Sequence, residues 1–454
     1  MLTKSELIEI MSDKILNDEA SLFVAAGLSQ SAGYCSWKDL LSPCAQKLKL
    51  EITDETDLYM LAQYFANTYG EPELRKIVSE KVNLISKESD LITALLKLNV
   101  KNIWTTNFDK ALEQRFLNQG IISKTISQEK DLTTITEKHT TIFKLNGDIS
   151  NLDGMIVTKN DYNKYLDNHE MFLTFLKREL AIKTFLFVGY SFKDSLILNC
   201  LEQITKCFAG SSPYHYTILK NDNSPYFKYF VDDLEKRYRI KTLIVDDFCE
   251  IPKVLNEIGE KTRNKKVFIS GSFDWLPQDQ DIYADSLCKS LVHTILDNNF
   301  RICTGLGRKL GNYISGHAYH YCMTRGINNI EKHLIMKPFH ELMEDSQKTS
   351  HREAMISECN IAIFAYGKSP SSTDEILLSK GVIEEFNIAK KCNKYIIPIG
   401  TTGFATKKIF EIVKSNIIEY PYLEKYIETL EKETDINKIC NVILSIIQDI
   451  NQSY

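Results

Sequence analysis

The sequence predicts an α/β fold with two doubly wound parallel sheets, and three observations support that class. The chain has 454 residues, more than one hydrophobic core of ordinary size accommodates. Short apolar runs alternate with longer amphipathic stretches, as strands and helices do in parallel sheets. The alternation stops in the charged segment 259–266, which has the composition of a linker, and then begins again. We therefore expect two Rossmann-like domains, residues 1–260 and 265–454.

Each expected strand is short, rich in β-branched or aromatic residues, and bounded by polar residues or glycine. In the first half, strands are expected at residues 21–25, 102–105, 141–144, 184–188, 216–219 and 242–245. In the second half, they are expected at residues 267–270, 300–303, 334–336, 361–364 and 395–399. Helical patterns separate these runs. Residues 29–100 are expected to be mostly helical, with Trp37, Leu40 and Leu41 in the core.

The composition argues against a nucleic-acid-binding, membrane-spanning or secreted protein. A net charge of -5 gives no general attraction to nucleic acid or to an anionic membrane. No apolar run approaches the roughly 20 residues that span a bilayer. The N-terminal segment lacks the layout of a signal peptide, so we expect a cytoplasmic protein. The 11 cysteines are scattered without a Cys-x-x-Cys pair, which predicts reduced thiols and no metal site.

The first candidate binding segment is Ala25-Ala-Gly-Leu-Ser29, directly after a predicted strand. Small residues such as Ala26 and Gly27 let a backbone approach a pyrophosphate, and Ser29 adds a hydroxyl. The alternative is that the turn needs small residues only for packing.

Thr105-Thr-Asn-Phe-Asp109 forms the second candidate segment, at the end of another predicted strand, where open α/β sheets bind ligands. Asn107 has both a donor and an acceptor, so it can hold a ribose hydroxyl or orient an attacking water. Asp109 can hold nearby backbone or balance positive charge on a reacting ribose. Helix capping is the simpler interpretation of both residues, and it is compatible with ligand binding.

Lys144-Leu-Asn-Gly-Asp148 and Gly189-Tyr-Ser-Phe192 follow two further predicted strands. Asn146 can hydrogen-bond a ribose hydroxyl but cannot take its proton near neutral pH. Gly189 and Ser191 are candidates for contact with a nucleotide. The simpler interpretations are a turn at Asn-Gly, and a helix cap with Ser191 as N-cap and Asp194 in the first turn.

The four segments together, residues 23–29, 104–109, 143–148 and 187–192, resemble the sirtuin NAD-binding domain. The resemblance implies that NAD is the substrate, bound by Ala26, Gly27, Ser29, Asn107, Asp109, Gly189 and Ser191, with Asn107 and Asn146 as catalytic residues. Two positions depart from the sirtuin pattern, because Ala25 replaces a glycine and Asn146 replaces the histidine that acts as a base. Sirtuins that deacylate proteins usually carry a zinc module held by four cysteines, and its absence disfavours deacylation.

In the second half, Ser270-Gly-Ser272 and the glycine-rich segment 304–311 each close a predicted strand, which suits a phosphate cradle. Together with Arg352 and segment 380–386 they resemble the SLOG superfamily. The segment 380–386 lacks the Gly-Gly-x-Gly-Thr run of SLOG nucleotide hydrolases, which favours ligand sensing. Arg352 can pair with a phosphate and Glu385 can accept hydrogen bonds from a ribose; a charged helix face is the alternative for both.

A zinc-free sirtuin-like domain followed by a SLOG-like domain is similar to the ThsA family, effectors of the Thoeris antiphage system. The resemblance implies an NAD hydrolase activated by a cyclic ADP-ribose isomer that a TIR-domain protein makes. The signal would bind at Gly271, Ser272, Lys368, Arg352 and Glu385. The resemblance also implies a homo-oligomer, a tetramer that assembles further into filaments.

Asn146 leaves three explanations open. It can be a natural replacement in an enzyme whose chemistry needs no base, the mark of an inactive homologue, or an engineered change that traps substrate. A second class of function therefore stays open: a nucleotide-binding sensor or oligomeric scaffold without turnover. The sequence does not determine the cyclic isomer, the gating mechanism or the assembly geometry.

Overall fold

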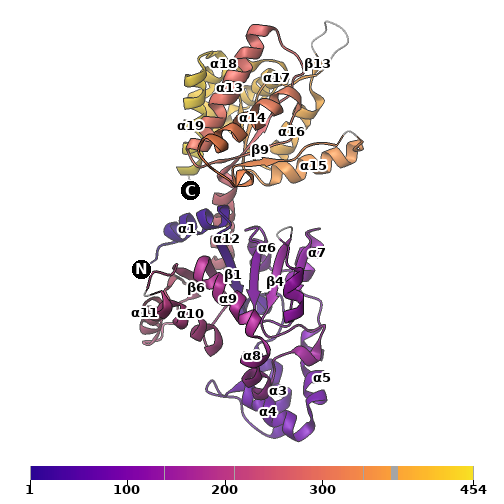
Figure 1. Cartoon of the computed structure of the whole chain (residues 1–454), viewed down its shortest axis with the longest axis vertical. Helices are drawn as coiled ribbons and strands as arrows, with labels where there is room; N and C mark the ends of the chain where they lie inside the picture. Colours follow the sequence, from indigo (N-terminus) through magenta and orange to yellow (C-terminus); the bar gives the residue numbers. More distant parts are fainter. Residues whose placement is uncertain (1, 137–138, 209, 341, 370–376, 453–454) are drawn as a thin grey trace. The chain divides into compact units, whose positions relative to one another are not determined.

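The computed structural model describes residues 2–136, 139–208, 210–340, 342–369 and 377–452. The chain divides into two compact units, Met1–Gly259 and Glu260–Tyr454. Within the described residues, unit 1 holds a seven-stranded parallel sheet and unit 2 a five-stranded parallel sheet. Both units are α/β, as the sequence predicts (Figure 1).

The strand order of the unit 1 sheet is β3-β4-β2-β1-β5-β6-β7. Its strands are β1 (Ala20–Val24), β2 (Asn102–Thr105), β3 (Ser123–Ile126), β4 (Thr140–Lys144), β5 (Thr184–Val188), β6 (His215–Lys220) and β7 (Ile240–Val245). Its helices are α1 (Lys4–Leu16), α2 (Ala26–Ser31), α3 (Trp37–Leu48), α4 (Leu58–Tyr69), α5 (Glu71–Val82), α6 (Asp90–Leu96), α7 (Ala111–Asn118), α8 (Lys159–Asn168), α9 (Glu170–Ile182), α10 (Ser195–Cys207), α11 (Phe227–Tyr238) and α12 (Glu250–Asn264).

Both faces of the unit 1 sheet are buried, which explains why its strands are apolar without a polar alternation. Along β1, Leu22 and Val24 join a core with helices α1, α6, α7 and α12. Phe23 points to the opposite face, into an aromatic core with helices α9, α10 and α11. On that face Trp104 stacks on Phe143, with ring centroids 4.2 Å apart.

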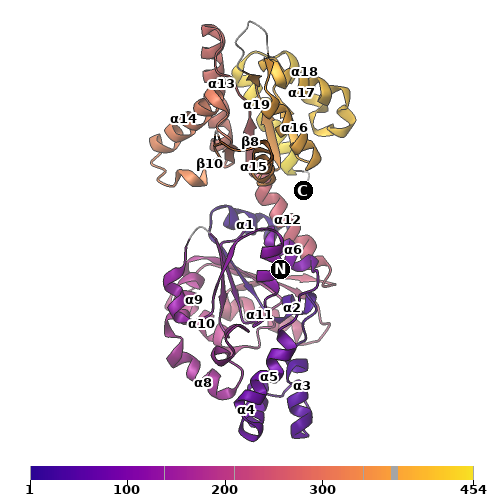
Figure 2. The ribbon, with the colours of Figure 1, turned by 90° about the vertical axis from the view of Figure 1, so that its right-hand side faces the viewer.

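Helices α3, α4 and α5 form a separate cluster at one end of the sheet (Figures 1 and 2). Its core contains Leu40 and Leu41, as predicted, with Trp37 packed against it in a partly buried position. The cluster also takes in Phe108, which follows β2, and Met155 and Val157, which follow β4. It therefore packs on the loops at the carboxyl ends of two central strands.

The strand order of unit 2 is β10-β9-β8-β11-β14, with a separate hairpin of β12 and β13. Its strands are β8 (Lys266–Ser270), β9 (Arg301–Thr304), β10 (Leu334–Met336), β11 (Ile361–Phe364), β12 (Lys368–Ser369), β13 (Leu377–Leu378) and β14 (Tyr395–Pro398). Its helices are α13 (Gln278–Asp297), α14 (Arg308–Thr324), α15 (Asp345–Ser357), α16 (Lys380–Lys391), α17 (Phe404–Ser415), α18 (Ile427–Lys432) and α19 (Ile436–Gln452).

The predicted linker at 259–266 is wrong, because helix α12 runs to Asn264 and β8 begins at Lys266. Ile251, Val254, Leu255 and Ile258 are buried at the spacing of one helix face. The charges that suggested a linker are in part Lys261 and Arg263 of the last turn, where the helix dipole favours cations.

The predicted strands are all present, with ends shifted by at most two residues, but three short strands were missed. β3 is an edge strand with a mostly half-buried, polar sequence, Ser-Lys-Thr-Ile, so it lacks the apolar run of a central strand. β12 and β13 have two residues each, too few for a sequence pattern.

Candidate functional site

The carboxyl ends of β1, β2, β4 and β5 come together in the middle of the unit 1 sheet. β1 pairs with β2 on one side and β5 on the other, so the chain reverses its direction of progress across the sheet at β1. Open α/β sheets bind ligands in the crevice outside such a switch point. The four segments expected to bind NAD follow these four strands.

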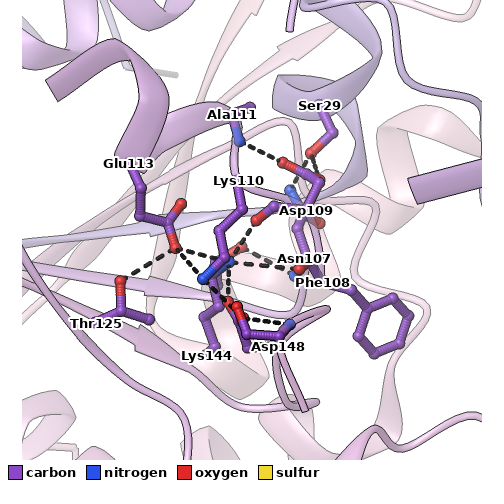
Figure 3. Close-up of polar contacts among 12 residues, drawn as sticks. Ser29, Asn107, Phe108, Asp109, Lys110, Ala111, Glu113, Thr125, Lys144 and Asp148 are labelled. Carbon is purple, nitrogen blue, oxygen red and sulfur yellow. Dashed lines mark hydrogen bonds and ion pairs between the residues drawn. The ribbon is translucent and has the colours of Figure 1, made fainter. Parts of the chain in front are cut away.

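Ser29, Asn107 and Asp109 form one hydrogen-bonded group at this edge (Figure 3). The Asn107 amide nitrogen donates to Ser29 Oγ at 2.7 Å, and Ser29 Oγ donates to Asp109 Oδ2 at 2.5 Å. Asp109 Oδ1 accepts from the Ala111 N–H at 2.9 Å, at the start of α7. Asp109 thus holds the first backbone N–H of α7 and also fixes Ser29, which agrees with the expectation that it holds nearby backbone. Its role toward a ligand stays a prediction.

Burial raises the pKa of the Asp109 carboxyl, and the hydrogen bonds from Ser29 and Ala111 and the nearby Lys144 oppose that shift. Because Ser29 donates to Asp109, the Ser29 hydroxyl oxygen is free to accept from Asn107. The Asn107 carboxamide is therefore held through its nitrogen.

Lys144 is buried beneath this group, with 1% of its side chain exposed. Its ammonium lies 2.7 Å from Asp148 Oδ2 and 2.8 Å from Glu113 Oε1, and it donates to the carbonyls of Phe108 and Asp109. Burial works against the charged form, but Glu113 and Asp148 outweigh it and raise the pKa of Lys144. Burial likewise opposes ionisation of Asp148, but Lys144 and Lys110 lower its pKa to about 2.

Asn146 is buried and faces the helical cluster of α3, α4 and α5. Its backbone carbonyl accepts from the Ile156 N–H at 2.9 Å, and its side chain lies close enough to the Tyr59 hydroxyl of α4 to affect the pKa of that tyrosine. The Tyr59 ring lies 4.9 Å from that of Tyr162, which hydrogen-bonds Asp194. Burial raises the pKa of Asp194, and its carboxyl lies near enough to Tyr59 to raise the pKa of that tyrosine.

The Asn-Gly turn interpretation holds for Gly147, whose φ is +91°. A Cβ there would lie 2.5 Å from the carbonyl oxygen of Gly154, so both conformation and space require glycine. Asn146 itself is outside the positive-φ region, so its identity is not imposed by the backbone.

Gly27 and Gly189 lie in direct backbone contact. The Gly27 N–H donates to the Gly189 carbonyl at 3.1 Å, and a Cβ on Gly27 would meet Gly189 Cα at 2.8 Å. Packing alone therefore explains both glycines. Ala25, where sirtuins have glycine, is extended with φ of -143°, which any residue adopts, so its methyl causes no backbone strain.

Two details of these segments differ from the prediction. Ala25 is the N-cap of α2, so helix begins at Ala26 and Ala26, Gly27 and Ser29 lie within it rather than in a loop before it. Asp194, and not Ser191, is the N-cap of α10 and accepts from the Leu196 N–H at 2.9 Å. Ser191 is exposed near the carboxyl end of β5, so its side chain does not cap the helix.

In unit 2 the switch point is β8, which pairs with β9 on one side and β11 on the other. Gly271 and Ser272 follow β8, with Gly271 against the Ala365 carbonyl. The Lys368 N–H donates to the Ser272 carbonyl at 2.8 Å, and the Lys368 ammonium lies 5.3 Å from the Trp275 ring centre. Lys368 is thereby held at the carboxyl end of β8.

Arg352 of α15 and Glu385 of α16 lie close to each other, next to the end of β8. Ser270 Oγ donates to Glu385 Oε2 at 2.6 Å, and Arg352 Nε lies 3.6 Å from Glu385 Oε1. Arg352 also pairs with Glu384 at 2.9 Å, so its guanidinium is already engaged by carboxylates. Burial raises the pKa of Glu385 to about 7, against the effects of Ser270 and Arg352.

Comparisons with known proteins agree with this division. The family model described as the SIR2-like domain matches residues 101–243, and that of the Sir2- and TIR-associating SLOG family matches residues 250–450. The protein named NAD(+) hydrolase ThsA from Acinetobacter baumannii is 31% identical over 96% of this chain and 98% of its own length. The chain belongs to the ThsA family.

Two further ThsA proteins show the same full-length similarity. The one from Enterococcus faecium is 30% identical over 99% of this chain and 100% of its own length. The one from Bacillus cereus is 28% identical over 97% of each chain. The expected sirtuin-like and SLOG-like halves of a ThsA protein are therefore confirmed.

In this member of the ThsA family, the structure joins Ser29, Asn107 and Asp109, and separately Arg352 with Glu385 and Ser272 with Lys368. Lys144 and Tyr59 lie outside the residues that the sequence predicts for this site. The i,i+4 spacing of Lys144 and Asp148 was a usable signal for the first. No signal existed for Tyr59, because its helix joins the site only through tertiary packing.

Two negative findings apply to the described part of this ThsA chain. No helix there combines the length and the apolar character that a membrane crossing requires. No group of three or more His, Cys, Asp or Glu side chains among the described residues is arranged to hold a metal ion.

Proposed function

We propose that the protein hydrolyses NAD+ to nicotinamide and ADP-ribose at the carboxyl edge of the unit 1 sheet. The observation that carries this proposal is the bonded group of Ser29, Asn107 and Asp109, at the same edge of the sheet as Asn146, in a chain whose full-length relatives are named NAD(+) hydrolases. Ala26, Gly27, Gly189 and Ser191 lie at the same edge and are the proposed neighbours of the dinucleotide.

In the proposed reaction the bond between ribose and nicotinamide breaks, and its electron pair neutralises the positive nicotinamide ring. The ribose becomes an oxocarbenium-like cation, so no acid is needed for the leaving group. Water adds to the anomeric carbon and loses a proton to solvent. Asn107, oriented by Ser29, accepts a hydrogen bond from that water and places it, which is catalysis by positioning.

Asn146 is proposed to bind a ribose hydroxyl without deprotonating it. A carboxamide has no basic site near neutral pH, and general base catalysis contributes about 10²–10⁴-fold to rates. This chain is therefore proposed to be slower than a version with histidine at this position, but active.

The test is nicotinamide release from NAD+ by the full chain, with and without cyclic ADP-ribose isomers. We expect release with at least one isomer, and loss of at least 100-fold in the Asn107→Ala variant, because the water is no longer placed. Absence of release by the unmodified chain and by Asn146→His under every condition would contradict the proposal.

A second candidate is a nucleotide-binding sensor or scaffold without turnover. Asn146 favours it, because a carboxamide is not a base near neutral pH. It predicts NAD+ binding by calorimetry and no nicotinamide release, so the same experiment separates the two functions.

We further propose that unit 2 binds a cyclic ADP-ribose isomer made by a TIR-domain protein and so activates unit 1 in antiphage defence. The description of its family, Sir2- and TIR-associating, supports the origin of the signal. Gly271, Ser272, Lys368, Arg352 and Glu385 are the proposed signal contacts. A cytoplasmic homo-oligomer, a tetramer that extends into filaments, is proposed from the family resemblance, and light scattering tests it.

A further inference from the structure

Lys144 connects two loops that are far apart in the sequence. It is the last residue of β4, two positions before Asn146, and it donates to the carbonyls of Phe108 and Asp109 in the loop after β2 (Figure 3). That loop includes Asn107. One ammonium group therefore touches both segments that carry the proposed catalytic asparagines.

The anionic partners of Lys144 strengthen this connection. Asp148 lies two residues beyond Asn146 and bonds Lys144 at 2.7 Å through one oxygen. Its other oxygen accepts from the Ser150 N–H at 2.8 Å and lies 2.7 Å from Lys110 Nζ, which belongs to the β2 loop. Glu113 in α7 bonds Lys144 at 2.8 Å and Thr125 of β3 at 3.1 Å. The Lys144 ammonium and its two carboxylate partners therefore connect β3, β4 and α7.

We propose that Lys144 is a positioning residue for NAD+ hydrolysis, which fixes the distance between Asn107 and Asn146 by bracing the two loops against each other. The inference rests on the proposed function. Lys144 itself is buried and does not contact the substrate. Without its ammonium, the Phe108 and Asp109 carbonyls lose a shared donor, and the Asn107 loop is free to move relative to Asn146.

A purely structural role would destabilise the fold but leave each folded molecule fully active. A positioning role lowers kcat for molecules that still bind NAD+. The decisive quantity is therefore kcat for each NAD+-binding site, with sites counted by calorimetry and turnover measured as nicotinamide release in the presence of cyclic ADP-ribose isomers.

The test variant is Lys144→Met in the full chain, which removes the charge and keeps the chain length. The matched control is Glu179→Gln. Glu179 is also buried, and it accepts from Trp104 Nε1 at 2.8 Å and Ser21 Oγ at 3.0 Å, but near the amino ends of β1, β2 and β5. Both variants disturb a buried charge in unit 1, on β4 for Lys144 and on α9, which packs on the same sheet, for Glu179. Only the first lies at the proposed site.

We expect Lys144→Met to lower kcat for each binding site about 100-fold, the effect of a displacement of roughly 1 Å, with the Kd for NAD+ changed less than threefold. Glu179→Gln should lower the melting temperature and keep kcat within twofold. Each variant is also combined with Asn146→His, which supplies a base and is expected to raise the kcat against which the variants are compared.

Equal kcat for Lys144→Met and the unmodified chain would overturn the positioning role while leaving the proposed function intact. If the unmodified chain and Asn146→His both fail to release nicotinamide, the proposed function and this inference fall together. If Lys144→Met does not fold, Glu113→Gln is the variant that tests the inference, because it removes the charge of one ion-pair partner of Lys144. A kcat lowered at least threefold supports the inference, and an unchanged kcat contradicts it.

Discussion

Asn146 is the residue whose side chain bears most directly on the proposed reaction. The residue lies in a glycine-requiring turn, but its own backbone conformation permits other side chains. The carboxamide lies beside Tyr59 and has no site that accepts a proton near neutral pH. Its effect is therefore expected on the chemical step rather than on folding.

We predict that Asn146→His increases kcat for NAD+ hydrolysis by about 10²–10⁴-fold above pH 7, because a neutral imidazole supplies the missing base. The increase should be lost as the pH falls below about 6.5, where imidazole becomes protonated. Nicotinamide release measured between pH 5.5 and 8.5 checks both points. Asn146→Gln is the control, because it keeps the amide without adding a base, and an equal increase in that variant would contradict the explanation.

At the scale of elements, Ser270 at the end of β8 and Glu385 on α16 form a buried contact that links the sheet to a helix of the proposed signal site. Arg352 of α15 and Glu384 are the other charged groups near this carboxyl. Burial raises the Glu385 pKa from 4.5 to about 7. Its ionisation in the folded state is therefore unfavourable relative to the unfolded chain.

The pH dependence of stability follows from that shift. Between pH 4.5 and 7 the folded state keeps a proton on Glu385 that the unfolded state has released, so stability decreases as the pH rises through this window. The decrease is on the order of 3 kcal/mol. We predict that Glu385→Gln, which stays neutral, removes this decrease and raises the melting temperature at pH 8. Scanning calorimetry of the full chain at pH 5 to 8 checks it, and a Glu385→Gln profile parallel to that of the unmodified chain would count against it.

At the scale of the whole molecule, the proposed gating requires that binding to one unit changes the other. A coupling free energy between two binding sites acts equally in both directions. If the signal lowers the Kd for NAD+ by some factor, NAD+ must therefore lower the Kd for the signal by the same factor. Trp275 offers a readout, because it is 66% exposed and lies beside Lys368, while Trp104 in unit 1 is fully buried.

We predict that cyclic ADP-ribose quenches Trp275 fluorescence when it is titrated into the full chain. NAD+ should shift the midpoint of this titration. The size of that shift should equal the factor by which cyclic ADP-ribose changes the Kd for NAD+. Couplings between sites are typically about 5–150-fold. Asn107→Ala is suited to the titration because it is expected to bind NAD+ with little turnover. The Trp275→Phe variant, which should lose the fluorescence change, is the control. If the signal leaves the Kd for NAD+ unchanged and NAD+ leaves the titration midpoint unchanged, the prediction is contradicted and the signal acts on kcat and not on NAD+ binding.

The sequence by itself determined the two α/β halves, the central strands and the order of the site loops, because these depend on local apolar periodicity and on glycine-rich turns. It also placed Ser29, Asn107 and Asp109 at strand ends. The tertiary structure alone decided that Asp109 holds Ser29, that Asn146 meets Tyr59 of α4, and that Lys144 joins two loops. It also decided that segment 250–264 is one helix. These outcomes depend on contacts between residues distant in the chain, and a buried charge such as Lys144 is stable only beside partners that local sequence does not specify.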